Sequence, residues 1–198
     1  MIYSVVKRML DILGSALSLV LLSPVFLILM LCIRLDSKGP LFFTQRRIGK
    51  HKREFLIYKF RTMQVDTPKN VPTHLLENPT QYITKVGAFL RKTSLDELPQ
   101  LWNILKGDMS FVGPRPALYN QEDLVAERDR YGANDVWPGL TGWAQIHGRD
   151  ELSISEKARL DGEYVANYGL WIDIRCFFGT FLSVFRQEGV VEGKHDTK

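Results

Sequence analysis

The most unusual feature of the chain is a long apolar run close to its first residue. Residues 14–33 include no charged side chain, and nearly all of them are apolar. About twenty such residues match the length of a membrane helix, whereas core helices of globular domains seldom stay uncharged for so long. The run continues into Arg34 and Asp36 rather than into a small-residue cleavage site, which argues against a cleaved signal peptide. The pattern therefore predicts a membrane-inserted segment.

A proline interrupts this apolar run near its middle, at Ser23-Pro24. Proline removes a helix hydrogen bond and bends or breaks the helix. Each half then has about ten to fourteen residues, too few at about 1.5 Å per residue to cross about 30 Å of hydrocarbon. Cations flank both sides (Lys7 and Arg8 before, Arg34 and Lys38 after), and positive charge prefers the cytoplasmic side. Because spanning helices also tolerate proline, these residues alone favour a re-entrant hairpin and a spanning helix equally.

The rest of the chain alternates between short extended and helical patterns. Residues 41–47 and 54–63 favour strands around a basic turn at 48–53, which predicts a β-hairpin. The polar segment 64–81 contains three prolines and predicts a surface loop. Helices are expected at 84–92, from within 93–100 to a glycine cap at Gly107, at 120–131, and from the Ser153/Glu156 capping box to about residue 168. These elements predict a helix-rich α+β fold with a small β-hairpin.

An aromatic segment lies near the end of the chain, at residues 171–185. It mixes tryptophan, phenylalanine and isoleucine with few charges. Such a stripe is typical of a core helix, but aromatic side chains also favour the headgroup level of a bilayer. The sequence supports a core helix and an interfacial amphipathic helix equally.

The positive charge of the chain is concentrated directly after the apolar run. The formal net charge is +4, whereas residues 34–61 hold nine Lys or Arg against two acids, a net of +7. A basic stretch beside a membrane segment is attracted to anionic lipid by about 1 kcal/mol per cation. We therefore expect contact with membrane lipid and no binding of nucleic acid, although a solvated charged face would have the same composition.

Several classes of site have no signal in the sequence. Cys32 and Cys176 lie in unrelated segments and suggest neither a disulfide framework nor a metal site, so the catalytic part is expected in the reducing cytoplasm. The chain contains neither a Walker-type phosphate loop nor a G-x-G-x-x-G fingerprint. Its histidines do not show zinc-ligand spacing.

Two adjacent carboxylates, Asp96 and Glu97, stand where a helix is expected to begin. Ser94 and Glu97 fit a capping box, and acids are favoured in a first helical turn, so these residues alone favour a structural role. The same place suits chemistry, because free N–H groups at a helix N-terminus stabilise phosphate oxygens. The positive electrostatic field of the helix N-terminus would also keep Asp96 ionised and ready to attack phosphorus. A hard divalent ion, most plausibly Mg²⁺, would offset the repulsion between carboxylate and phosphate.

Five cations are candidate phosphate ligands. Each alone is more simply a surface charge or an ion-pair partner, but the planar guanidinium of arginine suits phosphate oxygens. Arg115 and Arg149 rank highest because they lie in irregular, Gly/Pro-marked segments. The remaining candidates are Lys59, Arg61 and Arg91.

Four segments of the sequence resemble motifs of one family, the bacterial sugar transferases, which are monotopic phosphoglycosyl transferases. They are YKFRTM at 58–63, LRKTSLDELPQ at 90–100, LWNILKGDMSFVGPRP at 101–116 and PGLTGWAQIHGR at 138–149. The resemblance extends over about residues 5–186, and the combination of LRKTSLDELPQLWN with GPRP is highly specific. The chain looks like a minimal catalytic core of this family.

The resemblance implies an architecture and a location. Residues 1–40 would form a re-entrant membrane helix broken at Ser23-Pro24, with both ends cytoplasmic, which decides between hairpin and span. Residues 41–198 would form a cytosolic catalytic domain docked on the membrane surface, with interfacial amphipathic helices. The protein is expected on the cytoplasmic face of a bacterial inner membrane.

The resemblance also implies a reaction. A UDP-sugar would donate its sugar-1-phosphate to a polyprenol phosphate, undecaprenyl phosphate, and UMP would leave. Asp96 would be the nucleophile that forms a covalent phosphosugar intermediate and would contact Mg²⁺. Glu97 would be the base that assists the acceptor phosphate. Arg149 and Arg115 would be the main phosphate binders, and Arg91, Lys59 and Arg61 would be the lower-ranked candidates.

Two other functions compete with this one. A membrane-anchored phosphohydrolase would use the same acids with water as the acceptor. A non-enzymatic membrane scaffold would not require acids and arginines in these words. Release of the nucleoside monophosphate, with and without a lipid acceptor, separates the three.

Overall fold

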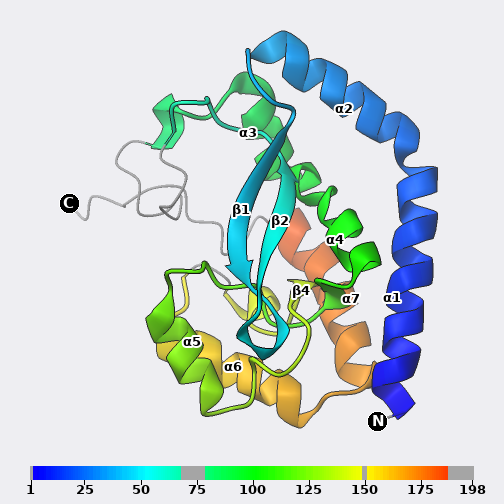
Figure 1. Ribbon diagram of the computed structural model, residues 1–198, viewed down its shortest axis with the longest axis vertical. Helices are drawn as coiled ribbons and strands as arrows, with labels where there is room; N and C mark the ends of the chain where they lie inside the picture. Colours follow the sequence, from blue (N-terminus) through cyan, green and yellow to red (C-terminus); the bar gives the residue numbers. More distant parts are fainter. Residues whose placement is uncertain (1, 68–78, 149–150, 187–198) are drawn as a thin grey trace.

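The computed structural model describes residues 2–67, 79–148 and 151–186 and has the expected helix-rich α+β architecture (Figure 1). β1 and β2 pair antiparallel, and β3 and β4 pair in parallel. The strands are β1 (Phe42–Ile48), β2 (Glu54–Phe60), β3 (Ser110–Val112) and β4 (Gly139–Thr141). The α-helices are α1 (Ile2–Leu21), α2 (Ser23–Asp36), α3 (Lys85–Lys92), α4 (Gln100–Lys106), α5 (Glu122–Asp129), α6 (Ile154–Ala166) and α7 (Leu170–Arg186), and the 3₁₀ turns are η1 (Lys50–Lys52), η3 (Pro79–Gln81), η4 (Leu95–Glu97) and η5 (Gln145–His147).

The apolar run is divided between two helices, α1 and α2, which are bent by 61° relative to each other (Figure 1). The break lies at Leu22, and Pro24 stands in the first turn of α2, where its missing N–H costs nothing. The Ser23 hydroxyl donates to the Val20 carbonyl at 2.7 Å and closes the end of α1. The interruption that the sequence predicts at Ser23-Pro24 is therefore confirmed.

The bent pair α1–α2 differs from each of its two helices in length and apolar composition relative to a bilayer. Among the described residues, no single helix is long and apolar enough to cross a bilayer, whereas α1 and α2 together meet that test by length and composition. Both outer ends of the pair are bonded to the same globular body. Asp11 in α1 accepts the Phe111 N–H at 3.0 Å, and Asp36 at the end of α2 accepts the Val86 N–H at 3.1 Å.

The first half of the pair, α1, is amphipathic. Lys7, Asp11 and Ser15 recur every four residues, lie on one face of the helix and are buried. Lys7 donates to the Asp173 carboxylate of α7 at 2.5 Å, and Tyr3 donates to the same carboxylate at 2.6 Å. The opposite face is lined by exposed apolar side chains, among them Val5, Met9, Leu13, Leu17 and Val20.

This arrangement changes the role of the cations that precede the apolar run. The sequence placed Lys7 as a flanking charge at the membrane, but it is buried in an ion pair with Asp173. Its neighbour Arg8 donates to the carbonyls of Ile104 at 2.9 Å and Leu105 at 3.2 Å in α4. The sequence could not show this, because the partners lie about 100 and 166 residues further along the chain.

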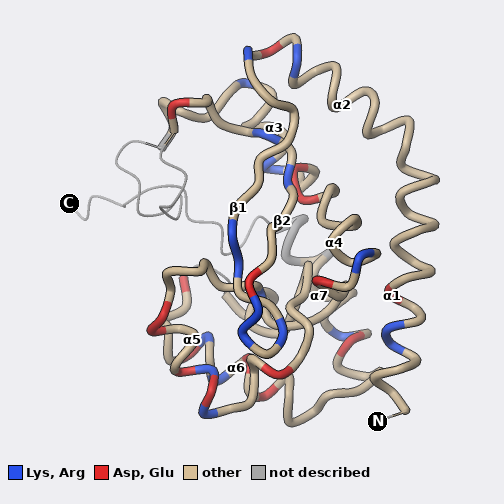
Figure 2. The backbone as a smooth tube through the Cα atoms, in the orientation of Figure 1, with Lys and Arg blue, Asp and Glu red and all other residues tan. Residues whose placement is uncertain are grey.

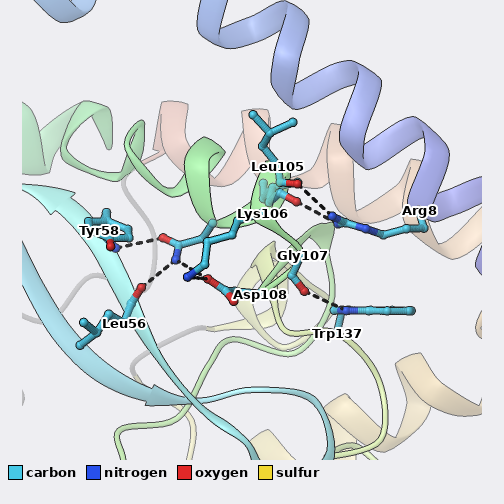
Figure 3. Close-up of polar contacts among 10 residues, drawn as sticks. Arg8, Leu56, Tyr58, Leu105, Lys106, Gly107, Asp108 and Trp137 are labelled. Carbon is cyan, nitrogen blue, oxygen red and sulfur yellow. Dashed lines mark hydrogen bonds and ion pairs between the residues drawn. The ribbon is translucent and has the colours of Figure 1, made fainter.

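The C-terminal end of α4 is the point at which three distant segments meet (Figure 3). On one side, the buried carboxamide of Asn103 accepts the Tyr58 N–H at 3.0 Å and donates to the Leu56 carbonyl at 2.7 Å, so it pairs with β2 as a neighbouring strand would. On the other side, Arg8 of α1 approaches the last carbonyls of the helix, and the Trp137 indole donates to the Gly107 carbonyl at 3.2 Å. These contacts satisfy carbonyls that a helix end leaves without partners.

The tip of the β1–β2 hairpin concentrates positive charge, visible as blue at its lower end in Figure 2. These cations contact the end of α5 and the segment that follows it. Lys52 pairs with Asp129 at 2.9 Å, the His51 imidazole contacts Asp135 at 2.9 Å, and the Lys50 ammonium lies 3.6 Å from the centre of the Trp137 ring. The tip therefore fastens the hairpin to the domain, a role that charge counting alone did not indicate.

Helix α7 resolves the two interpretations of the aromatic segment by having two different faces. Ile172 and Cys176 are buried in a cluster with Tyr164 of α6 and Val112 of β3. The other face is open, and Trp171 is 70% exposed. The helix therefore contributes to the core and also presents an aromatic, apolar surface.

Structural features that depend on neighbouring residues were predicted correctly from the sequence. Gly107 ends α4 in a left-handed conformation with φ 105°. Ser153 caps α6, and its hydroxyl and the Glu156 carboxylate form both contacts of a capping box. The expected loop at 64–81 lies largely outside the described residues, which omit 68–78.

Asn103→Leu should separate β2 from α4. The Tyr58 N–H and the Leu56 carbonyl would lose their partner, and a buried polar group without a partner costs about 1–3 kcal/mol. We expect a lower free energy of unfolding and faster amide hydrogen exchange at Tyr58. Asp108→Ala is the matched control, because it removes the 3.2 Å contact of Asn103 and the exposed 3.0 Å pair with Lys106 but neither contact of Asn103 with β2, and it should leave the Tyr58 amide protected. Equal exchange in both variants would contradict this role.

Candidate active site

The candidate site is built on a turn between α3 and α4. Ser94 adopts a left-handed conformation with φ 56° and reverses the chain after α3. Asp96 and Glu97 follow in the 3₁₀ turn η4, and each is only 8% exposed. A non-glycine residue with positive φ is uncommon, and such strain is often found at functional sites. The two carboxylates are therefore held inside the protein on a tightly turned backbone.

The capping box expected from Ser94 and Glu97 is not formed. The Ser94 side chain makes no capping hydrogen bond, and the regular helix α4 begins only at Gln100. The Glu97 carboxylate instead accepts hydrogen bonds from the Lys59 ammonium and from the Arg115 guanidinium, both at 2.8 Å to Oε1. This prediction was wrong because charge-assisted contacts from distant segments are stronger than a local cap. It also removes the structural explanation for the acidic pair.

Lys59 reaches this cluster from β2. The strand is held in register by its pairing with β1, where Lys59 lies opposite Phe43, and by the contact of Asn103 with Tyr58. Burial lowers the pKa of the Lys59 ammonium below its usual range, and the Glu97 carboxylate opposes this shift. The strand therefore delivers a largely buried cation to Glu97.

Arg115 is placed by the close contact of two glycine-containing loops. A Cβ atom on Gly113 would lie 2.2 Å from the Trp137 carbonyl oxygen, and one on Gly139 would lie 2.1 Å from the Gly113 nitrogen. The Gly113 N–H donates to the Thr141 carbonyl at 2.8 Å, and the Gly139 N–H donates to the Pro114 carbonyl at 2.9 Å. The words GPRP and PGLTG are thus two halves of one structure that orients Arg115.

Asp96 differs from Glu97 in its surroundings. Among the residues that the structure describes, its carboxylate forms no hydrogen bond or ion pair. Burial raises the pKa of Asp96 above its usual range; Lys59, Arg91 and Arg115 oppose the shift, and Glu97 adds to it. The expectation that a helix N-terminus keeps Asp96 ionised therefore needs modification, because burial raises the pKa of Asp96 and the nearby cations offset that rise only in part.

The other candidate cations do not all lie beside the acidic pair. Arg91 lies in the last turn of α3 and acts electrostatically on Asp96. Arg61 is directed elsewhere: its guanidinium donates to the Ser37 and Lys38 carbonyls at 2.8 and 2.6 Å, at the end of α2. Arg149 lies outside the described residues. Thus Lys59, Arg91 and Arg115 surround the acidic pair, and phosphate binding by any of the five remains a prediction.

Asp96 and Glu97 offer a limited set of metal ligands. Within the described ranges, no group of three or more His, Cys, Asp or Glu side chains could hold a metal ion. Mg²⁺ does not require such a group, since it keeps several waters and is usually bound by one or two carboxylates together with substrate phosphates. The unpaired carboxylate of Asp96 therefore fits an ion that arrives with a phosphate ligand.

Sequence reasoning missed the residues that support this site. Asn103 reads as an ordinary polar residue of a helix, and Gly113 and Gly139 as turn glycines. Their sequence signal was their position inside the matched segments LWNILKGD, GPRP and PGLTG. Their function is to bring β2 and the Arg115 loop to the acidic turn.

The fold and the site define a helix-rich α+β protein with a buried, cation-lined aspartate. Residues 2–187 match the bacterial sugar transferase family. The chain therefore belongs to this family and is an enzyme of the transferase class.

Individual relatives agree with this assignment. The chain is 39% identical to EpsL of Bacillus subtilis, an uncharacterized sugar transferase, over 98% of this chain and 94% of the relative. It is 38% identical to the UDP-N-acetylgalactosamine-undecaprenyl-phosphate N-acetylgalactosaminephosphotransferase of Aeromonas hydrophila, over 92% of this chain and 44% of that protein. It is 41% identical to the UDP-glucose:undecaprenyl-phosphate glucose-1-phosphate transferase of Escherichia coli, over 91% of this chain and 39% of that protein. The chain thus spans less than half the length of each of the last two relatives, whose names state a reaction.

Lys59→Met should raise the pKa of Asp96 further. The Lys59 cation opposes the upward shift caused by burial, so its removal leaves burial and Glu97 less compensated. Infrared spectroscopy can follow the protonated carboxyl band that Asp96→Asn abolishes, and this band should persist to higher pH in Lys59→Met. Lys59→Arg and the hairpin-tip variant Lys52→Met should titrate as the unmodified protein does. A band that disappears at unchanged or lower pH in Lys59→Met would refute the electrostatic coupling.

Proposed function

We propose that this chain transfers sugar-1-phosphate from a UDP-sugar to undecaprenyl phosphate and releases UMP, as the first membrane step of bacterial glycoconjugate assembly. The observation that carries the proposal is the buried carboxylate of Asp96, which has no hydrogen-bond or ion-pair partner among the described residues, beside a Glu97 that is bonded to Lys59 and Arg115. Membership of the sugar transferase family supports the reaction class. The names of the two longer relatives support the lipid acceptor and the nucleotide-sugar donor.

In the first half of the reaction, Asp96 acts as the nucleophile. One carboxylate oxygen forms a bond to the phosphorus that carries the sugar, and the bond from this phosphorus to the UMP oxygen breaks. UMP leaves, and an aspartyl-phosphosugar remains on the enzyme. Burial supports this role, because a carboxylate that is only 8% exposed, and that accepts no hydrogen bond within the described part of the chain, needs little desolvation before attack.

In the second half, an oxygen of undecaprenyl phosphate attacks the same phosphorus. The bond to Asp96 breaks, the carboxylate is regenerated, and the lipid carries the sugar through a diphosphate. Glu97 is suited to accept a proton from the incoming phosphate, since it lies next to Asp96 in η4 and its position is fixed by Lys59 and Arg115. One carboxylate used twice replaces a single difficult displacement by two easier ones.

The cations around the pair provide the electrostatic part of catalysis. Lys59, Arg91 and Arg115 bring positive charge to the place where two phosphate groups must approach two carboxylates. Arg149 joins them by its place in the matched segment PGLTGWAQIHGR, whereas the guanidinium of Arg61 donates to the Ser37 and Lys38 carbonyls and is left out of this set. Asp96 would hold Mg²⁺, which when bound would neutralise the charge of the donor phosphates.

We infer that the chain is monotopic and lies on the cytoplasmic face of a bacterial inner membrane. Both ends of the bent pair are bonded to one globular body, which supports a hairpin that enters and leaves the bilayer on the same side. The exposed apolar faces of α1, α2 and α7 support contact with lipid. A site at this surface lets a water-soluble donor meet a lipid-bound acceptor.

The reaction can be tested with purified protein, Mg²⁺, a panel of UDP-sugars and undecaprenyl phosphate. UMP release should require the lipid for repeated turnover, and mass spectrometry should detect one phosphosugar bound to the enzyme when lipid is withheld. Asp96→Asn should lose the adduct and at least about 99.9% of turnover, because the nucleophile is absent. Glu97→Gln should still form the adduct but should discharge it slowly.

Three outcomes would count against the proposal. Absence of UMP with every donor would exclude the transferase, and an adduct that survives in Asp96→Asn would exclude the assigned nucleophile. Repeated UMP release without lipid would favour a phosphohydrolase. Arg130→Gln, at an exposed ion pair with Glu127, is the matched control and should behave as the unmodified protein.

The hairpin can be tested by labelling single cysteines in a variant in which Cys32 and Cys176 are replaced by alanine. Cysteines placed at Ser4 and Lys38 should both react with a membrane-impermeant maleimide in inside-out vesicles, and neither should react in right-side-out vesicles. Leu21→Cys, at the exposed bend, should be shielded in both preparations. Reaction of the two flanking positions from opposite sides would demonstrate a spanning helix.

A further inference from the structure

The end of α2 is attached to the strand that carries Lys59. The guanidinium of Arg61, only 5% exposed, donates to the Ser37 carbonyl at 2.8 Å and to the Lys38 carbonyl at 2.6 Å. Carbonyls at a helix C-terminus lack partners within the helix and carry partial negative charge, so a cation is favoured there. Arg61 follows Lys59 by two residues. One short segment thus reaches both Glu97 and the apolar helix.

The residue between them strengthens the same attachment. Phe60 is buried in a cluster with Leu29 and Ile33 of α2 and with Leu90 of α3. Its ring centre also lies 5.3 Å from that of Phe26 in α2. Lys59, Phe60 and Arg61 therefore connect, in order, the acidic turn, the inner face of α2 and the end of α2.

A second contact fixes the same helix end to the other side of the site. The Asp36 carboxylate accepts the Val86 N–H at 3.1 Å, in the first turn of α3. Helix α3 continues to Arg91 and then to the turn with Asp96. The end of α2 is thus bonded to Arg61, directly after the strand that carries Lys59, and to α3, the helix that leads into the acidic turn.

The connection after α2 is built around the guanidinium. Gly39 has φ 131°, and a Cβ atom there would lie 2.9 Å from Arg61 Nη1 and 2.5 Å from Val65 Cγ2. Arg34 donates to the Gly39 carbonyl at 3.3 Å. A lysine could not reproduce the two-carbonyl contact, because its single ammonium lacks the planar arrangement of donors.

We propose that Arg61 is a positioning residue for the lipid acceptor: it fixes the apolar helix α2 relative to the acidic turn and so determines how undecaprenyl phosphate meets the phosphosugar on Asp96. The inference rests on the proposed function. The donor arrives from water and does not depend on α2. The acceptor arrives with its chain in the apolar layer that Leu27, Ile28 and Leu31 of α2 would contact. Arg61 should therefore control the second half of the reaction and not the first.

The test measures the two halves separately in Arg61→Met, Arg61→Lys and the exposed hairpin control Arg53→Met. In single turnover without lipid, formation of the adduct and UMP should stay within about twofold of the unmodified protein in every variant. When undecaprenyl phosphate in vesicles is added, discharge of the adduct should be about tenfold slower or more in Arg61→Met, since a displacement of reacting groups by about 1 Å can cost ~100-fold. Arg61→Lys should recover this loss only in part.

Each alternative has its own outcome. If Arg61 binds the donor phosphates, Arg61→Met will slow adduct formation and raise the KM for the UDP-sugar. If its role is only structural, both halves will fall by the same factor. If neither half changes, the junction has no role in catalysis. Any of these results overturns the inference while leaving the proposed function intact.

A measurement without turnover keeps the two proposals distinguishable. Spin labels at Leu31 on α2 and Lys92 on α3 should give a narrow distance distribution in vesicles, which should broaden in Arg61→Met and in Gly39→Ala but not in Arg53→Met. If the unmodified protein releases no UMP with any donor, the proposed function fails. Whatever the turnover assay shows, an unchanged distance distribution in Arg61→Met would refute the positioning role.

Discussion

The hydrogen bonds at the C-terminal end of α4 are the constraint on which the rest of the structure depends. This helix is only seven residues long, so its last carbonyls represent a large part of its backbone. Arg8 and Trp137 donate hydrogen bonds to carbonyls at that end, and Asn103, within the helix, accepts the Tyr58 N–H. Each contact attaches a different part of the molecule. Arg8 brings α1, Asn103 brings the strand with Lys59, and Trp137 brings the loop that orients Arg115. The acidic turn at the other end of α4 receives its surroundings from these attachments.

The site that results combines two carboxylates in different electrostatic conditions. Glu97 is bonded to two cations, whereas Asp96 is buried without such a partner and has a raised pKa. Environments that differ in this way give neighbouring acids different chemical functions. The difference does not come from the residues themselves, which are adjacent and similar. It comes from their contacts: Glu97 accepts hydrogen bonds from Lys59 and Arg115, whereas these cations act on Asp96 only through its charge.

The sequence was informative where a feature depends on neighbouring residues. The break at Ser23-Pro24, the left-handed Gly107 and the capping box at Ser153 were all predicted, because proline, glycine and a serine three residues before a glutamate act locally. The same logic failed at Ser94 and Glu97, since Lys59 and Arg115 lie 38 and 18 residues away and compete with the cap. It failed for Lys7 for the same reason. The candidate site itself was predicted from matched words, while the reason for those words, the contact of Gly113 with Gly139, required the structure.

The buried polar stripe of α1 has a consequence for how the protein is made. Lys7 and Asp11 leave the ribosome first, but their partners Asp173 and Phe111 follow 166 and 100 residues later. At a synthesis rate of about 5–20 residues per second, Lys7 waits roughly 8–33 s for its counter-ion. During that interval the helix carries charges on the face that will later be interior, and they must stay hydrated. Helix α1 therefore cannot reach its final environment until Asp173, in the first turn of α7, has been synthesised.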